Sequence, residues 1–293
     1  MNILNTTICL YSDTGEGKSF LLGEYAIYLH LLSEKKKRSI VYLSDKGGWK
    51  TIEPAIALGA IQIVPHEGNI FDWTNHIVKG EVPDGKGKWT KPNPAEIAMY
   101  AYEGATSIAE EMDLAIRNSH EGPGAGIGSA VSKSKVTATD TSVHLDKSHF
   151  GLMQTEVRDA IWQSQELPGI VLWTFRARRV EASDTDTRSP ILGPQVAGKA
   201  MTPDLPAWFH YTFRVGCVVA AGQPERHILY FGGHVDPTTG LAKGMGNVRT
   251  PLGAEPMPQS IEPASLVKAM QEIQKRASVK VDEAAFKAKY GIK

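Results

Sequence analysis

Residues 12–19 contain the group types that bind a chain of phosphates. They read Ser-Asp-Thr-Gly-Glu-Gly-Lys-Ser, with an apolar run at residues 8–10 before them and a helical pattern after them. Glycines let backbone N–H groups approach phosphate oxygens, and the N-terminus of the next helix attracts anions. Strand, glycine loop, lysine, hydroxyl and helix in this order predict a phosphate-binding P-loop. The alternative is an ordinary strand-to-helix turn.

Each position of this loop has an expected role. Lys18 would reach the β- and γ-phosphates, and the Ser19 hydroxyl would hold Mg²⁺. Ser12 stands where the usual pattern has its first glycine, but Gly15 and the Gly17-Lys18-Ser19 triplet keep the part that contacts phosphate. We expect cofactor contacts from Ser12, Asp13, Thr14, Gly15, Glu16, Gly17, Lys18, Ser19 and Phe20.

Two acidic residues follow apolar runs that are typical of buried strands. Asp45 follows residues 39–43, and Glu103 ends the run 97–103. Ligands collect at the carboxyl ends of parallel strands, so Asp45 is placed to face a γ-phosphate; equally, it is a turn aspartate before two glycines. A strand-end carboxylate opposite a P-loop orients the water shell of Mg²⁺, which is the role expected for Glu103. Glu110 and Glu111 are most simply exposed helix charges.

The periodicity of apolar residues predicts an α/β fold. Strands and helices alternate early in the chain and hairpin-like strands come late, which predicts a mainly parallel central sheet with helices on both faces and an antiparallel extension. Two stretches without a pattern, residues 118–146 and 180–206, are expected to be long loops. Residues 1–258 would form the core and residues 259–293 a helical tail. Helices are expected at 20–34, 51–58, 71–78, 106–116, 150–165 and 265–277, and strands at 39–43, 61–64, 97–104, 170–175, 208–220 and 227–232.

Composition narrows the class of protein. The chain has 293 residues, 42% of them apolar, and no apolar run long enough to cross a bilayer. It enters a strand directly, so a cytoplasmic protein without membrane contact is expected. Thirty-two basic residues balance 32 acidic ones, so any polyanion must be bound by local clusters. Cys9 and Cys217 lie in apolar, strand-like runs and are expected to be small core residues, without metal or disulfide spacing.

The order of these motifs resembles that of the RecA-like P-loop ATPase core. The resemblance covers about residues 5–255 and is closest to phage nucleotide-binding proteins associated with single-strand annealing. It implies ATP and Mg²⁺ as cofactors, a homo-oligomer, action in DNA recombination in a bacterial host's cytoplasm, and contact with a single-strand DNA-binding protein. It rests on the P-loop, Asp45-Lys46-Gly47-Gly48, Glu103-Gly104-Ala105-Thr106-Ser107 and the run from Asp146 to Leu152.

The resemblance also implies roles for residues outside the P-loop. Thr174 occupies the position of a polar sensor at a strand end. Lys243 and Arg249 lie where basic residues reach a neighbouring subunit's γ-phosphate; the alternative is that both are exposed loop charges. Loops 119–147 and 177–205 correspond to loops that bind single-stranded DNA. The DNA-contacting residues would be Lys133, Lys135, Lys147, Arg176, Arg178, Arg179, Arg188 and Lys199.

Departures from the family pattern keep other functions open. Lys46 stands where the family has a catalytic glutamate, so Asp45 is the nearest carboxylate and ATP hydrolysis is expected to be weak. The first alternative is a P-loop ATPase switch or scaffold that acts on protein partners without DNA, which the neutral net charge also favours. A small-molecule kinase comes last, because the sequence shows no specific substrate pocket.

Overall fold

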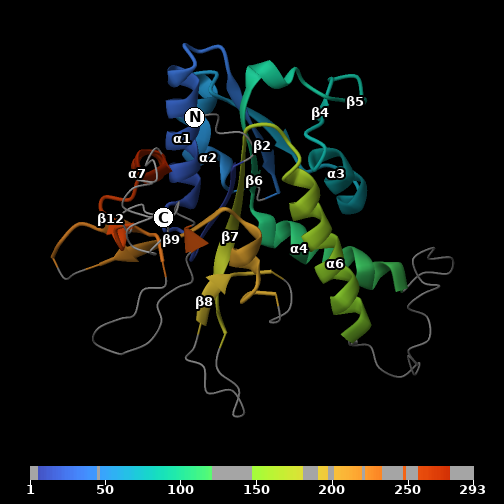
Figure 1. The fold of residues 1–293 in the computed structure, drawn as a ribbon. Helices are drawn as coiled ribbons and strands as arrows, with labels where there is room; N and C mark the ends of the chain where they lie inside the picture. Colours follow the sequence, from blue (N-terminus) through green and yellow to red (C-terminus); the bar gives the residue numbers. More distant parts are fainter. Residues whose placement is uncertain are drawn as a thin grey trace, which may run out of the picture.

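A mixed α/β sheet, covered by helices on both faces, forms the centre of the molecule (Figure 1). The computed structural model describes residues 6–44, 47–120, 147–180, 191–196, 201–219, 222–232, 247–248 and 257–277. Within this part, ten strands join in one sheet, and its main path runs β12-β10-β9-β1-β7-β6-β2-β3. The strands from β9 to β3 on this path are parallel, whereas β10 and β12 pair antiparallel at one edge. The predicted fold class is therefore confirmed.

The parallel strands are the ones that carry the predicted site. They are β1 (Thr6–Ser12), β2 (Arg38–Leu43), β3 (Ile61–Pro65), β6 (Ile97–Glu103), β7 (Ile170–Val180) and β9 (Tyr211–Val218). The antiparallel strands are β8 (Ile191–Pro194), β10 (Arg226–Tyr230), β11 (Asn247–Val248) and β12 (Ser260–Ile261). A separate two-stranded hairpin pairs β4 (Val82–Pro83) with β5 (Trp89–Thr90).

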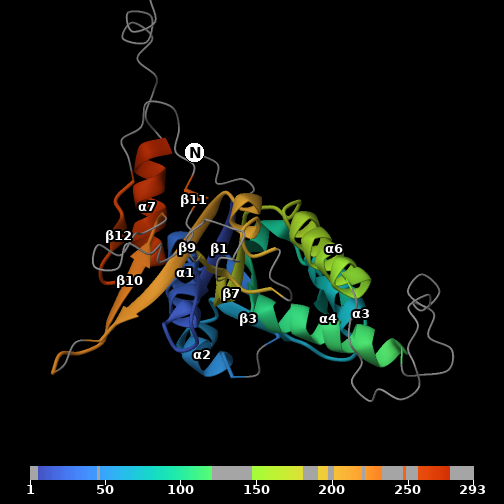
Figure 2. The same cartoon turned by 90° about the horizontal axis from the view of Figure 1, so that it is seen from below.

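Helices cover the sheet in two layers, which Figure 2 shows from below. On one face lie α1 (Lys18–Leu32), α2 (Trp49–Ala57) and α7 (Leu266–Ala277). On the other face lie α3 (Ile70–Ile77), α4 (Ala105–His120) and α6 (Lys147–Ser164). Short 3₁₀ turns occupy Pro94–Glu96 and Leu205–Trp208.

Strand β1 shows why the sheet needs both layers. Its side chains alternate between the two faces: Ile8 and Leu10 belong to the core under α1, and Cys9 and Tyr11 to the core under α4. Successive side chains of a strand point to opposite faces, so a strand that is apolar at every position must be covered on both. That pattern explains why the continuous apolar run at residues 8–11 is buried in the middle of the sheet.

An aromatic row fixes the strand ends that carry the predicted acid and sensor. Tyr42, Tyr102 and Trp173 face each other on β2, β6 and β7, with ring centroids 5.2 Å and 4.0 Å apart along the row. Tyr102 donates a hydrogen bond to the Ile77 carbonyl at 3.0 Å. Cross-strand aromatic pairs stabilise strand register, so the next residues along β6 and β7 are held in place.

The second predicted loop contains more structure than its sequence indicates. Strand β7 continues to Val180, so Arg176, Arg178 and Arg179 lie within a strand and do not follow its end. The β8 strand pairs with this extension, and a 3₁₀ turn starts at Leu205, which interrupts the loop predicted at residues 180–206. The sequence of β8 is short and rich in Pro and Gly, so it does not predict a strand. Strand β8 forms because it pairs with β7.

Part of the predicted C-terminal tail belongs to the same core. Strand β12 pairs with β10, and α7 packs its apolar side against the sheet and α1. The buried side chains of α7 are Leu266, Ala269, Met270 and Ile273. Among the described helices, none combines the length and apolar character that crossing a membrane requires.

Candidate phosphate-binding site

The predicted P-loop connects β1 to α1 by a turn that needs its glycines. Gly15 and Gly17 have φ angles of +87° and +100°, in the left-handed region that favours glycine. Gly17 is also the N-cap of α1, and its carbonyl accepts the first helical hydrogen bond, from Leu21 N at 3.0 Å. The N-terminus of a 15-residue helix therefore opens directly beside the loop, where it favours a bound anion.

Lys18 folds back over this loop. Its ammonium donates to the Ser12 carbonyl at 3.1 Å, the Ser12 hydroxyl at 2.9 Å and the Asp13 carbonyl at 3.0 Å. Burial lowers the pKa of Lys18, while the carboxylates of Glu103, Glu16 and Asp13 act in the opposite direction. All three ammonium hydrogens point at oxygens of the loop, which is the geometry that a phosphate oxygen would share or replace.

Ser19, Glu103 and Thr174 form a chain of short hydrogen bonds beside Lys18. The Ser19 hydroxyl donates to Glu103 Oε1, and the Thr174 hydroxyl donates to Glu103 Oε2, both at 2.6 Å. Thr174 also accepts from Gly104 N at 3.0 Å. Glu103 is only 4% exposed, so these partners fix both of its oxygens. The strand-end acid and the P-loop hydroxyl, 84 residues apart in sequence, are thus in direct contact.

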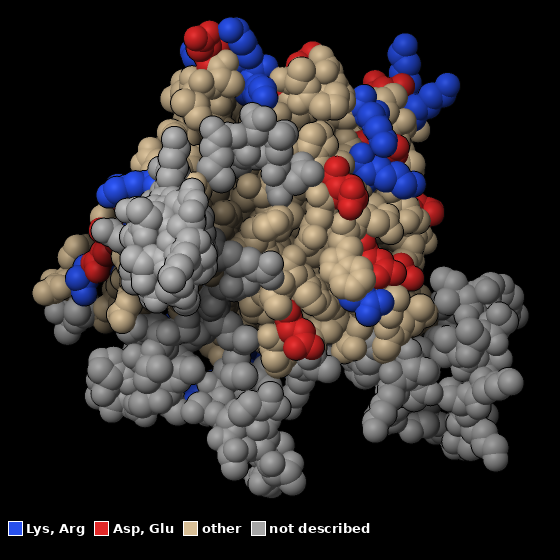
Figure 3. Space-filling view, in the orientation of Figure 1, with Lys and Arg blue, Asp and Glu red and all other residues tan. Residues whose placement is uncertain are grey.

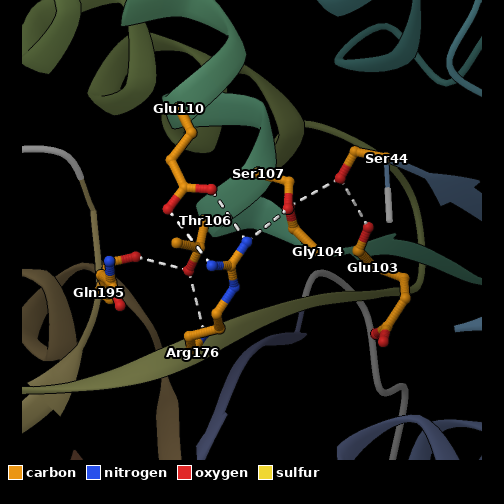
Figure 4. A network of polar contacts seen from close by, with 8 residues as sticks. All are labelled: Ser44, Glu103, Gly104, Thr106, Ser107, Glu110, Arg176 and Gln195. Atoms are coloured by element: carbon orange, nitrogen blue, oxygen red, sulfur yellow. Dashed lines mark hydrogen bonds and ion pairs between the residues drawn. The ribbon is translucent and has the colours of Figure 1, made fainter. Parts of the chain in front are cut away.

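The backbone around Glu103 is held from the neighbouring strand. Ser44, which follows β2, donates from its hydroxyl to the carbonyls of Glu103 at 3.0 Å and Gly104 at 2.7 Å (Figure 4). Its own N–H donates to the Glu103 carbonyl as well, at 3.2 Å. Gly104 has a φ of +83°, so the chain turns sharply here before α4 begins at Ala105. These contacts leave the Glu103 side chain little freedom to turn away from the P-loop.

Arg176 adds a second positive charge, after that of Lys18, to the cleft that contains Glu103. Its guanidinium donates to Glu110 at 2.9 Å and to the Ser107 hydroxyl at 3.0 Å, and both partners lie on α4 (Figure 4). Its backbone N–H donates to Thr106 Oγ1 at 2.9 Å. Glu110 is an exposed charge on α4, as expected, and it is also the ion-pair partner of Arg176. Glu111 likewise pairs with His66 at 2.7 Å.

Glu16 connects the P-loop to the antiparallel edge of the sheet. Its carboxylate accepts from Asp13 N at 2.9 Å and from Cys217 N at 3.3 Å. Its carbonyl accepts from His227 Nδ1 at 3.0 Å. The loop is consequently anchored to both β9 and β10, and not only to the strand and helix that flank it in sequence.

A cleft of about 970 Å³ contains these groups. One wall is formed by residues 14–21, Glu103, Thr174 and Arg176, all of which the sequence singled out except Leu21. The lining also includes Val215, residues 225–227 and residues 262–264, which the sequence did not indicate. The volume suits a small-molecule ligand, and the Ser19 hydroxyl and Glu103 carboxylate are the hard oxygen donors that Mg²⁺ prefers.

The other predicted site residues fall into two groups. Arg178 and Arg179 lie on β7 opposite β8. Lys147 begins α6, but its side chain lies outside the described residues. Also outside them are Asp45, Lys133, Lys135, Arg188, Lys199, Lys243 and Arg249, together with residues 121–146, 181–190 and 197–200 of the two loops.

The two cysteines differ in their surroundings. Cys9 is fully buried in the core, as expected, whereas Cys217 on β9 is partly exposed, and the expectation that it is a core residue is wrong. Burial raises the pKa of the Cys217 thiol, and the carboxylates of Glu225 and Glu16 raise it further. The apolar run around Cys217 did not reveal that β9 lies near the sheet edge, where its last residues face the P-loop.

Comparison with known proteins gives a distant likeness to solved structures. No family model and no curated protein matches the chain. Among solved structures, the chain is similar to the KaiC-like protein PH0186 from Pyrococcus horikoshii OT3, with 10% sequence identity, 78% of each chain covered and a TM-score of 0.39. A likeness this distant does not extend to activity or partners, so the functional conclusion depends on the geometry of the cleft.

Proposed function

We propose that this protein binds MgATP at its P-loop and hydrolyses it weakly. The observation that carries the proposal is the contact between the Ser19 hydroxyl and Glu103, with Thr174 fixing the other carboxylate oxygen. Ser19, Glu103 and Thr174 lie beside Lys18 in a cleft large enough for a nucleotide. A simple strand-to-helix turn would require neither the buried acid nor its two hydroxyl partners.

The hydrogen-bond pattern assigns a task to each residue. Ser19 donates its only hydroxyl hydrogen to Glu103, so its oxygen lone pairs are directed elsewhere and suit a hard cation. Lys18 can exchange the Ser12 and Asp13 oxygens for phosphate oxygens, which are stronger acceptors because they are charged. Bound Mg²⁺ would neutralise charge on the β- and γ-phosphates. Glu103 would orient the water shell of the bound Mg²⁺, and Arg176 would add positive charge at the same end of the cleft.

The first test is the affinity for MgATP measured by calorimetry. Lys18→Ala removes the cation that faces the loop, and a charged hydrogen bond is worth about 1.5–3 kcal/mol, so affinity should fall by roughly 10- to 100-fold. Lys36→Ala is the matched control, because Lys36 is exposed and pairs only with Glu34 in the described contacts. Equal affinity in the wild type and the Lys18 variant, with an unchanged circular dichroism spectrum, would exclude the P-loop assignment.

Glu103→Gln separates binding from hydrolysis. The amide keeps the size of the side chain but lacks the charge that orients water, so MgATP affinity should stay within a few-fold while the hydrolysis rate falls at least tenfold. The measurement is phosphate release at saturating ATP. A variant with the wild-type rate would show that Glu103 has a structural role only.

Single-stranded DNA binding is a further proposal that depends on the sequence resemblance. Of the predicted contacts, Arg176 lies in the cleft and is paired with Glu110. The face drawn in Figure 3 shows basic and acidic side chains interspersed among the described residues. Binding of a labelled oligonucleotide at increasing salt tests the proposal: log K should fall linearly with log salt, and Arg178→Ala/Arg179→Ala should reduce the slope.

The alternative is a switch or scaffold that acts on protein partners, and it predicts that single-stranded DNA has no effect. Its ATPase rate should be the same with and without single-stranded DNA.

The proposed homo-oligomer is tested by mixing Lys18→Ala protein with Lys243→Ala/Arg249→Ala protein. Recovery of activity in the mixture would show that sites are shared between subunits, as for cations acting in trans.

A further inference from the structure

Three potential metal ligands meet beside the cleft, and two of them, Glu225 and His227, line it. Cys217 on β9 and His227 on β10 are directly paired across the antiparallel ladder. Glu225 lies two residues before His227 and immediately before β10 begins at Arg226. The Cys217 Sγ, a Glu225 carboxylate oxygen and a His227 ring nitrogen all lie within 4.8 Å of one another. The intervening Arg226 pairs with Glu262 at 2.9 Å.

The tautomer of His227 favours metal binding. A carbonyl oxygen can only accept, so the 3.0 Å contact to the Glu16 carbonyl requires the hydrogen on Nδ1. In the neutral ring the lone pair then lies on Nε2. Histidine ligands in proteins commonly donate their second N–H to a carbonyl or carboxylate in this way, which fixes the ring and strengthens the ligand. His227 therefore already has its supporting partner.

The size of the cluster also fits a small divalent cation. Bonds of about 2.0–2.3 Å in a tetrahedral site separate the ligand atoms by about 3.3–3.8 Å, so small side-chain rotations would close the observed spacing. Two carboxylates act on the Cys217 thiol: that of Glu225 and that of Glu16, which accepts from Cys217 N at 3.3 Å. Two carboxylates next to a thiol repel one another in the absence of a cation, and a divalent ion would offset that repulsion.

We propose that Cys217, Glu225 and His227 form a Zn²⁺ site at the edge of the cleft. A thiolate, an imidazole and a carboxylate together select a borderline-soft cation, whereas Mg²⁺ prefers oxygen ligands alone. Three protein ligands leave a fourth position for water, on the side where Glu225 and His227 line the cleft. The site goes beyond the proposed ATPase function and does not depend on it, because its ligands are distinct from Lys18, Ser19 and Glu103.

Zinc affinity of the full chain, reduced and stripped with chelator, tests the proposal. Competition with a chromophoric chelator should give one equivalent of Zn²⁺ bound with a Kd below about 1 µM. Cys217→Ser and His227→Gln should each weaken binding by at least tenfold. Glu225→Gln should also weaken it, and Glu225 is exposed, so this variant is expected to fold normally. Co²⁺ in place of Zn²⁺ should show thiolate-to-metal charge-transfer absorption that disappears in Cys217→Ser.

Matched controls come from the same chain. Cys9→Ala removes the buried thiol, and His76→Gln breaks an imidazole–carboxylate pair, His76 with Glu81 at 2.6 Å, that lacks a cysteine. Both should keep the wild-type zinc affinity. The proposal is overturned by a Kd weaker than about 100 µM, by Co²⁺ binding without thiolate absorption, or by equal losses in the cluster and control variants.

Discussion

Replacing Thr174 with valine tests the hydrogen bond between the Thr174 hydroxyl and the Glu103 carboxylate. Thr174 is fully buried, and valine has nearly its shape but lacks the hydroxyl. The hydroxyl donates to Glu103 at 2.6 Å and accepts from Gly104 N at 3.0 Å. Thr174→Val therefore removes one bond to a carboxylate and deprives a backbone N–H of its partner in a single step.

The expected cost follows from these two contacts. A hydrogen bond to a charged group contributes about 1.5–3 kcal/mol, and a buried donor without a partner costs about 1–3 kcal/mol. The two terms share one hydroxyl and are not additive, so we expect a loss of about 3 kcal/mol in the free energy of unfolding. At about 2–4 °C per kcal/mol for chains of this order of size, the melting temperature should fall by roughly 6–12 °C.

Thermal unfolding followed by circular dichroism measures this change. Thr212→Val is the matched control, because Thr212 is also fully buried, and the partners of its hydroxyl within the described residues are neutral: the Pro206 carbonyl at 3.2 Å and the Cys9 thiol. Its loss should be about 1 kcal/mol. Thr174→Ser keeps the hydroxyl and should stay close to the wild type. If Thr174→Val and Thr212→Val melted at the same temperature, the contact with Glu103 would add no stability and the reasoning would be refuted.

Three further variants test the loop, the ion pair and the C-terminal helix. Gly17→Ala forces a side chain into a φ of +100°, so the free energy of unfolding should fall by about 1 kcal/mol or more and MgATP binding should weaken. An unchanged free energy of unfolding and an unchanged MgATP affinity would show that the loop adapts. A double-mutant cycle of Arg176→Ala and Glu110→Ala should give a coupling below about 1 kcal/mol, since both side chains are about 40% exposed; a larger coupling would contradict this. Met270→Ala on α7 should cost about 2–5 kcal/mol in global unfolding, whereas a loss near zero would mean that the helix is a separate tail.

The sequence determined the elements whose signals are local. A strand, two glycines, a lysine and a serine lie within a few residues of each other, so the P-loop could be recognised without knowledge of the rest of the chain. Apolar periodicity placed α1, β2 and β6 to within about two residues because burial on one or both faces imposes that period on each element separately. The position of Glu103 at a strand end followed from the same pattern.

The tertiary structure alone decided which of these residues meet. The Thr174 hydroxyl reaches Glu103, 71 positions away, only because β7 pairs beside β6 in one register. Cys217 faces His227 for the same kind of reason: the β9–β10 register puts them opposite each other, and a shift of one residue would move either side chain to the other face of the sheet. Register depends on packing summed over the whole sheet, and no short stretch of sequence contains that information.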